Sequence, residues 1–156
     1  MNKQVQQVTI AGFGGQGVMM IGQLLAYAGT EAGYQSLWFP SYGPETRGGT
    51  ANCAVTISFD VIHSPVFAKA SCVMALNKPS LLKFQDKVQP GGFLLYNSSL
   101  ILDPVQSSVA NVYAIPMHEI AAKVGSPKVA NMVMLGVYLA LVTTFDLTLI
   151  KKVLHA

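Results

Sequence analysis

Charged side chains are scarce in this sequence of 156 residues. They make up 11% of the chain, against about a quarter in ordinary soluble domains. Hydrophobic residues make up 51%, and the mean hydropathy is +0.43. A chain of this composition either lies in a membrane or has much of its surface packed against partner subunits, because soluble monomers rarely expose large apolar patches.

Long uninterrupted hydrophobic runs are also lacking. The longest, Val129–Phe145, falls short of the roughly 20 residues that span a bilayer, and Asn131 and two threonines interrupt it. No apolar run that could act as a secretory signal precedes the first glycine. We therefore expect a cytoplasmic protein without a membrane span, and we expect Val129–Phe145 to be a buried helix, because a helix apolar on every side is otherwise buried.

Metal-binding patterns are missing as well. The two cysteines, Cys53 and Cys72, do not form a C-x-x-C pair, and two thiols provide neither a disulfide framework nor a complete ligand set for zinc or an iron–sulfur cluster. We expect both to be packed apolar thiols. His63, His118 and His155 lack the i, i+4 spacing that sets two ligands on one helical face. The sequence predicts no metal site, and its net charge of +3, which reflects few acids and no basic stripe, predicts no nucleic-acid partner.

Short β-rich runs alternate with helical patterns along the chain. Strands are expected at 8–11, 34–39, 50–59, 70–76, 93–97 and 111–115, and helices at 18–33, 78–88, 117–124 and 129–145, with QPGG (89–92) breaking the second helix. This alternation predicts a single α/β domain over 1–156, with a mainly parallel sheet covered by helices on both faces. A last helical pattern, 147–156, runs into the C-terminus and leaves open whether the domain is truncated there.

A glycine-rich loop follows the first expected strand. Gly12, Gly14 and Gly17 fit G-x-G-x-x-G between a strand and a helix, where free backbone N–H groups attract an anion such as a phosphate. Gly15 adds a fourth glycine, and the Gln16 amide could donate to a phosphate or to a neighbouring subunit. The alternative, that these glycines only permit close packing of strand and helix, stays open.

A nicotinamide dinucleotide requires more than this loop. It also requires an Asp or Glu about 20 residues further on, at the end of the second strand, to hold the ribose hydroxyls. Here that strand ends in Phe39, Pro40 and Ser41. The sequence therefore argues against a small NAD(P)-dependent dehydrogenase.

The second candidate loop contains Arg47, the only arginine in the chain. Its planar fork suits bidentate contact with a phosphate or carboxylate, which lysine cannot reproduce. Pairing of Arg47 with Glu45, which would only stiffen the loop, is an equally good interpretation. This loop follows the second strand, so we expect it to lie at the same carboxyl edge of the sheet as the glycine loop. Asn131, the polar exception on the long apolar helix, is either a ligand contact or a satisfied amide near the helix start.

Together the two loops resemble a known family. The segments IAGFGGQGVMMIGQLLAYAG, WFPSYGPETRGGTANCAVTIS, ALNKPSLLKF, PGGFLLYNSSLI and SPKVANMVMLG resemble, in this order, the gamma subunit of 2-oxoacid:ferredoxin oxidoreductases. The likeness runs from about Val8 to about Leu141 and is nearer to the 2-oxoglutarate and branched-chain members than to the pyruvate members. The residues that match the family motifs are Gly12, Gly14, Gly15, Gln16, Gly17, Tyr42, Glu45, Arg47, Gly48 and Gly49.

The resemblance implies a Rossmann-like domain in a multisubunit enzyme. Such an enzyme decarboxylates a 2-oxoacid on thiamine diphosphate with Mg, transfers the acyl group to coenzyme A and reduces ferredoxin through an iron–sulfur cluster. The resemblance places the thiamine and cluster sites on other subunits of the enzyme. The partners that it implies are alpha and beta subunits and ferredoxin, and a ferredoxin-like delta subunit is left open. This chain would bind no cofactor alone, carry no catalytic residue, be inactive alone, and help to form the coenzyme A approach. The alternative is a free-standing nucleotide-binding or regulatory module.

Overall fold

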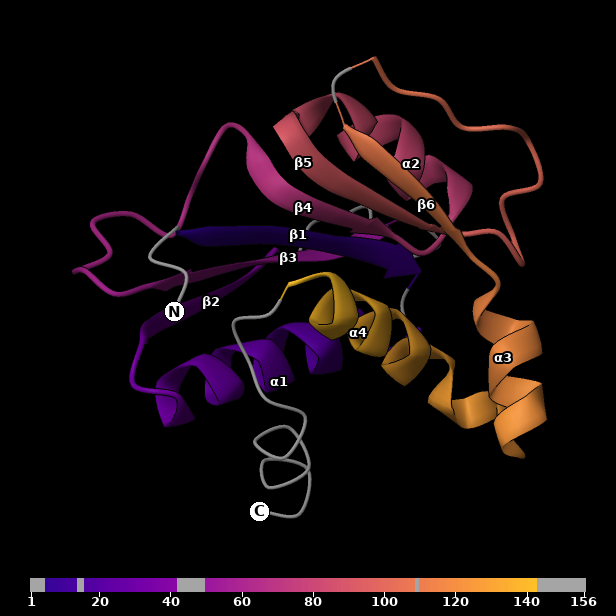
Figure 1. Ribbon diagram of the computed structural model, residues 1–156, viewed down its shortest axis with the longest axis horizontal. Helices are drawn as coiled ribbons and strands as arrows, with labels where there is room; N and C mark the ends of the chain where they lie inside the picture. The colour runs from indigo at the N-terminus through magenta and orange to yellow at the C-terminus, as the bar shows by residue number, and fades with distance from the viewer. Residues whose placement is uncertain (1–4, 14–15, 42–49, 109, 143–156) are drawn as a thin grey trace.

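A six-stranded sheet forms the centre of the computed structural model, which describes residues 5–13, 16–41, 50–108 and 110–142 (Figure 1). The elements are β1 (Gln6–Phe13), α1 (Val18–Glu31), β2 (Gln35–Ser41), β3 (Thr50–Ser58), β4 (Ala70–Ala75), α2 (Lys78–Phe84), the 3-10 turn η2 (Gln85–Lys87), β5 (Val88–Asn97), β6 (Asn111–Ile115), α3 (Met117–Val124), the 3-10 turn η3 (Pro127–Val129) and α4 (Ala130–Leu141).

The strand order is β2-β3-β1-β4-β5-β6. Strand β1 pairs with β4, β4 with β5 and β5 with β6 in parallel, whereas β3 is antiparallel to both β2 and β1. The expected mainly parallel α/β sheet is confirmed, and β3 is its exception. The connection from Ser41 to Thr50 is shorter than the dozen or so residues of a parallel crossover, so β3 returns alongside β2.

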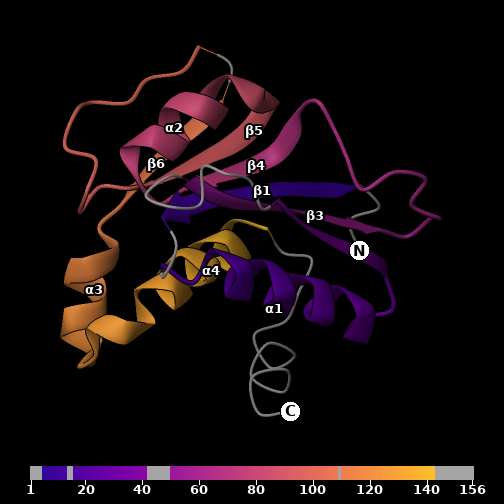
Figure 2. The same cartoon turned by 180° about the vertical axis from the view of Figure 1, so that it is seen from behind.

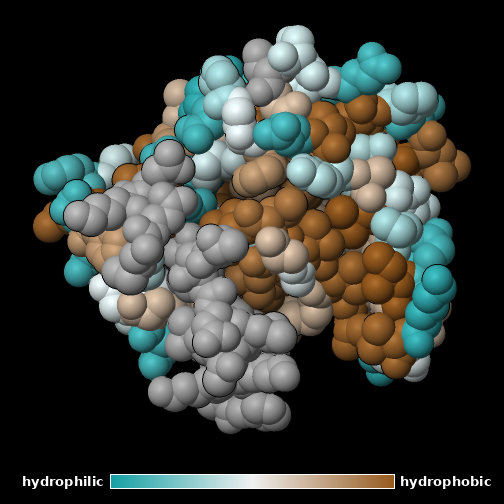
Figure 3. Space-filling view, in the orientation of Figure 1, coloured by the Kyte–Doolittle hydropathy of each residue, from teal (hydrophilic) through white to brown (hydrophobic). Residues whose placement is uncertain are grey.

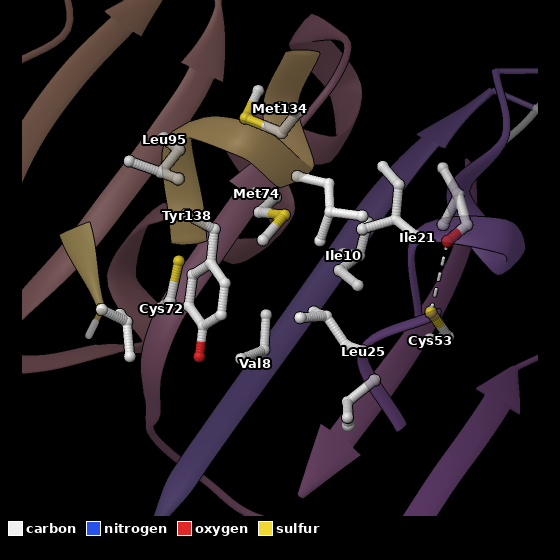
Figure 4. Close-up of a cluster of buried hydrophobic side chains, with 14 of the residues drawn as sticks. Val8, Ile10, Ile21, Leu25, Cys53, Cys72, Met74, Leu95, Met134 and Tyr138 are labelled. Atoms are coloured by element: carbon white, nitrogen blue, oxygen red, sulfur yellow. Dashed lines mark hydrogen bonds between the residues drawn. The ribbon is translucent and has the colours of Figure 1, made fainter. Parts of the chain in front are cut away.

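Helices cover both faces of the sheet. Figures 1 and 2 show α1 and α4 on one face and α2 on the other. On the first face, Ile10 packs with Ile21 and Leu25 of α1 and with Tyr138 of α4, and all four side chains are fully buried (Figure 4). A second cluster forms under α2 around Val73. The core is thus two layers divided by the sheet, as the sequence predicted.

The long apolar helix differs from its expectation. Helix α4 buries the side chains of Met134, Leu135 and Tyr138, whereas Gly136 and Ala140 are exposed. The expectation of a helix buried on all sides is therefore wrong for the described part, because α4 has the sheet and α1 on one side only. Figure 3 shows hydrophobic residues gathered on the surface over α4 and toward α3. No helix in the described ranges is long and apolar enough to cross a membrane.

The segment QPGG does not stand between two elements but lies inside β5. Helix α2 ends at Phe84, and β5 already begins at Val88, pairing with Ala70 before a register shift in β4. Gly91 takes a φ of +80°, which a glycine allows without strain. The sequence predicted that QPGG ends a helix. The structure instead has an irregular start of the β4–β5 ladder at this segment.

Candidate anion-binding site

The glycine loop ends in a helix start that leaves backbone donors available. Gly17 caps α1 with a φ of +79°, and no side chain makes a cap hydrogen bond there. The first intrahelical bond joins the N–H of Ile21 to the carbonyl of Gly17 at 3.1 Å. The N–H groups of the first turn, which have no carbonyl partner within a helix, face the end of the helix where its dipole is positive.

Gln16 closes the loop on itself. Its Oε1 accepts a hydrogen bond from the N–H of Phe13 at 2.6 Å, and its Nε2 donates to the carbonyl of Leu76 at 3.5 Å. A Cβ on Gly12 would lie 2.6 Å from this Oε1, so the glycine is required by close packing. The sequence indicated that the Gln16 amide could donate to a phosphate or to a neighbouring subunit. In the structure this amide already has hydrogen-bond partners within the chain.

Asn131 lies against the same helix start. Its side chain is 9% exposed, and its Nδ2 donates to Sδ of Met20 at 3.6 Å. A Cβ on Gly17 would come within 2.3 Å of that Nδ2. The structure therefore brings together Gly17 and Asn131, two residues that the sequence singled out separately.

A cavity of about 370 Å³ opens where three helices begin. Its lining comes from the starts of α1, α3 and α4 with η3, and comprises Gln16, Gly17, Met20, Met117, His118, Lys128, Ala130 and Asn131. The positive dipole ends of the helices and the ammonium of Lys128 favour an anion in the cavity. Such a cavity suits an anion with an apolar part, because Met20 and Met117 offer apolar surface beside the cationic groups.

His118 and Lys128 were not predicted as site residues. Each lies at a helix start marked by proline, His118 after Pro116 and Lys128 after Pro127, and these starts were visible in the sequence. The sequence did not show that these helix starts converge on Gly17, because this convergence depends on how α3 and α4 pack after the last strand.

Hydrogen bonds hold the start of α3 to the sheet edge. The N–H of His118 donates to Oγ of Ser99 at 3.0 Å, and this hydroxyl also bonds the carboxylate of Glu119. The bond from Ser99 lowers the pKa of Glu119 below its usual value. Asn97, fully buried, donates to the same Leu76 carbonyl that Gln16 contacts, at 3.2 Å. The glycine loop and the start of α3 are therefore anchored to one edge of the sheet.

Most residues of the arginine loop lie outside the described ranges. These are Tyr42, Glu45, Arg47, Gly48 and Gly49, and in the glycine loop Gly14 and Gly15. The residues on either side, Ser41 and Thr50, lie at the carboxyl edge of β1, since Thr50 pairs with Phe13 and Ser41 with Asn52. The segment 42–49 therefore begins and ends at the edge where the glycine loop lies.

Both thiols are buried in the core. Burial raises the pKa of Cys53 to about 11 and raises that of Cys72 further. Sγ of Cys53 donates to the carbonyl of Val18 at 3.6 Å (Figure 4). Within the described ranges, no three His, Cys, Asp or Glu side chains are grouped so as to hold a metal ion.

Solved structures share this fold. The gamma subunit of a keto/oxoacid ferredoxin oxidoreductase from Geobacter sulfurreducens matches 96% of the chain, and 84% of its own length, with a TM-score of 0.82 and 28% identity. A 2-oxoglutarate:ferredoxin oxidoreductase from Magnetococcus marinus, solved with 2-oxoglutarate, coenzyme A and succinyl-CoA bound, matches 98% of the chain with a TM-score of 0.86 and 26% identity. The match covers 27% of that longer chain.

Sequence relatives agree with the structures. The ketoisovalerate oxidoreductase subunit VorA of Methanothermobacter thermautotrophicus is 44% identical over 135 residues, which are 86% of this chain and 28% of that protein. The chain thus spans little more than a quarter of this relative. The family model of pyruvate ferredoxin/flavodoxin oxidoreductases matches residues 7–156. The resemblance seen in the two loops is confirmed, and the chain belongs to the pyruvate ferredoxin/flavodoxin oxidoreductase family.

Proposed function

We propose that this chain is the gamma subunit, or gamma-type domain, of a 2-oxoacid:ferredoxin oxidoreductase, and that its cavity receives the diphosphate of coenzyme A. The observation that carries the proposal is the convergence of three helix starts, with Lys128 and His118, on the glycine loop. The coenzyme A named for the Magnetococcus enzyme supports this choice of anion.

The residues of the cavity fit this ligand. A diphosphate needs backbone N–H donors and cations, which the first turn of α1 and Lys128 provide. The thioether side chains of Met20 and Met117 adapt to an irregular apolar surface such as that of a pantetheine arm. The volume of about 370 Å³ lies within the range of about 300–1,000 Å³ typical of small-molecule sites.

The remaining chemistry belongs, in this proposal, to other chains. Thiamine diphosphate with Mg would supply the chemistry for decarboxylating the 2-oxoacid, and an iron–sulfur cluster would supply the route for electrons to ferredoxin. The alpha, beta and delta subunits would hold these groups. The task of this chain is to bind and orient the acyl acceptor. The substrate class we propose is 2-oxoglutarate or a branched-chain 2-oxoacid, as in the relatives.

The first test compares the chain alone with the assembled enzyme. We expect no oxidoreductase activity from the purified chain, and viologen reduction dependent on a 2-oxoacid and coenzyme A once the other subunits are co-expressed. Full activity of the isolated chain would refute the proposal. A free-standing nucleotide-binding module would instead give an inactive co-expressed mixture and an isolated chain whose Tm rises with an adenine nucleotide.

A second test addresses the cavity. Lys128→Gln should raise the KM for coenzyme A about tenfold, because a charge-assisted hydrogen bond contributes roughly 1.5–3 kcal/mol. The KM for the 2-oxoacid should not change. Lys123→Gln is the matched control, since Lys123 is an exposed lysine near the end of α3 and does not line the cavity. An unchanged KM for coenzyme A in Lys128→Gln would rule out this cavity as the binding site.

A further inference from the structure

On the α2 face of the sheet, the helices of the described ranges leave two of the six strands, β2 and β3, without a helix above them. The buried cluster beneath α2 is built from α2, β1, β4, β5 and the segment after β5, and none of the residues assigned to it lies in β2 or β3. Helix α2 contacts β4 and β1, and Figures 1 and 2 show none of the described helices above β2 and β3 on that side. The α1 side of the same two strands is covered, since Cys53 and Val55 are buried there.

Exposed apolar side chains lie on this helix-free face of β2, although Thr56 and Ser58 of β3 on the same face are buried. Along β2, exposure alternates: Trp38 packs toward the core under α1, whereas its neighbours Leu37 and Phe39 are 38% and 44% exposed. The loop between β3 and β4 adds Val66, which is 67% exposed. We call the surface formed by Leu37, Phe39 and Val66 with the adjoining hollow the β2 face.

The hollow in the β2 face has the size of an anchoring side chain. Its volume is about 170 Å³, and its walls include Phe39, Ala54, Phe67, Phe84 and Lys87. A cavity of about 150 Å³ accepts a benzene ring. Interfaces are often anchored by one aromatic or aliphatic side chain that fills such a hollow.

Lys87 lines the hollow beside Phe84, and Lys83 and Lys69 lie near these two residues. The ammonium groups of Lys83 and Lys87 lie 5.4 and 5.3 Å from the centre of the Phe84 ring. Nζ of Lys69 donates to the carbonyl of Asp86 at 2.7 Å, which places a third ammonium next to the residue that precedes Lys87. The carboxylate of Asp86 is the only acid in the stretch 78–88. The border of the hollow beside Phe84 is therefore positively charged.

We propose that the β2 face docks an acidic segment of another polypeptide of the same enzyme, with one aromatic or aliphatic side chain of that segment in the hollow. The inference rests on the proposed function, in which the chain works within a larger assembly. Charge complementarity selects this partner. A second copy fits poorly, because a two-fold contact through this face would bring the lysines of both copies into one interface, in a chain of net charge +3.

Photocrosslinking in the assembled enzyme tests the contact. Phe39 is replaced by benzoylphenylalanine, an aromatic residue, and the crosslinked peptide is identified by mass spectrometry. Leu102, which is 85% exposed and lies after β5, is the control position. We expect position 39, and not position 102, to crosslink to an acidic segment of another subunit. A crosslink from position 39 to a second copy, to a segment without excess acid, or to nothing would overturn the proposal.

Charge reversal tests the lysines. Lys87→Glu should reduce co-purification of the other subunits at least about tenfold, whereas Lys87→Arg should retain it and Lys123→Glu should not affect it. Normal assembly of Lys87→Glu would also overturn the proposal. The two proposals can fail separately. An active enzyme that is not crosslinked at position 39 rejects the β2 face alone, whereas the absence of any active assembly with the wild-type chain rejects the proposed function, and with it the docking.

Discussion

Gly17 meets two requirements that no other residue type satisfies together. Its φ of +79° is strained for any side chain with a Cβ, and a Cβ would collide with Asn131. Gly33 has a similar φ of +92°, but a Cβ there would meet nothing within 4 Å. The two positions therefore separate the cost of backbone strain from the cost of the collision.

We expect Gly17→Ala to destabilise the chain clearly more than Gly33→Ala. Replacing a glycine at positive φ costs about 1 kcal/mol or more from strain alone, and overpacking against Asn131 adds roughly 1–3 kcal/mol. Urea titrations of both variants measure the difference in the free energy of unfolding. Equal losses in the two variants would show that Asn131 does not confine this glycine.

The spacing of Gly12 and Gly17 predicted a glycine loop between strand and helix. In the structure β1 ends at Phe13, α1 begins at Val18, and the N–H of Gln16 donates to the carbonyl of Phe13 at 3.2 Å. The same spacing did not show that Gln16 donates to the carbonyl of Leu76 or that Asn131 packs on Gly17. Those contacts join segments far apart in the chain. A local sequence pattern does not indicate which distant side chain will pack against a given residue.

Helix α4 has a glycine on its exposed side. Gly136 stands in the helix interior, where glycine costs about 0.5–1 kcal/mol relative to alanine, and a Cβ there would meet nothing within 4 Å. We therefore expect Gly136→Ala to raise the free energy of unfolding by up to about 1 kcal/mol. Urea titration checks the sign.

Gly22 in α1 is the matched control for this prediction. It is also a helix-interior glycine, but its Cβ would lie 2.6 Å from Sγ of Cys53 and 2.9 Å from the Trp38 ring. Gly22→Ala should destabilise despite the same gain in helix propensity. A gain of stability in both variants, or a loss in both, would contradict this account of helix packing.

The helix and strand periodicities located most elements, and the helix 117–124 was predicted with its observed bounds. Burial of α4 was overestimated, because an apolar sequence shows that a helix avoids water but not whether its own domain or another chain covers it. The sequence pattern of β3 likewise did not predict that this strand runs antiparallel to its neighbours. The burial of α4 and the direction of β3 both depend on contacts between elements.

The stability of the whole molecule should depend on pH through the core thiols. In the unfolded chain a thiol ionises near pH 9.0, whereas burial raises the pKa of Cys53 to about 11 and that of Cys72 further. Above pH 9 unfolding therefore releases protons, and the stability falls as the pH rises toward 11. Each thiol contributes at most about 1.4 kcal/mol per pH unit, and below pH 9 this contribution is fully present.

Unfolding free energies at pH 8 and pH 10 measure this decline, and Cys53→Ala should show a shallower one. Burial of both side chains also predicts that neither thiol of the folded chain reacts with dithionitrobenzoate at pH 8. Rapid labelling of the folded chain, or a stability that rises above pH 9, would contradict the burial of these residues.

The sequence by itself determined the α/β alternation, the position of the glycine loop and the excess of apolar surface, because periodicity and composition are local properties of the chain. Only the tertiary structure decided that β3 runs antiparallel and that Lys128 and His118 join Gly17 at one cavity. It also decided that β2 carries the exposed Leu37 and Phe39 on a side where none of the described helices lies above them. Each of these depends on packing between elements distant in the chain, where connection length and shape complementarity select one arrangement among several that the same local patterns allow.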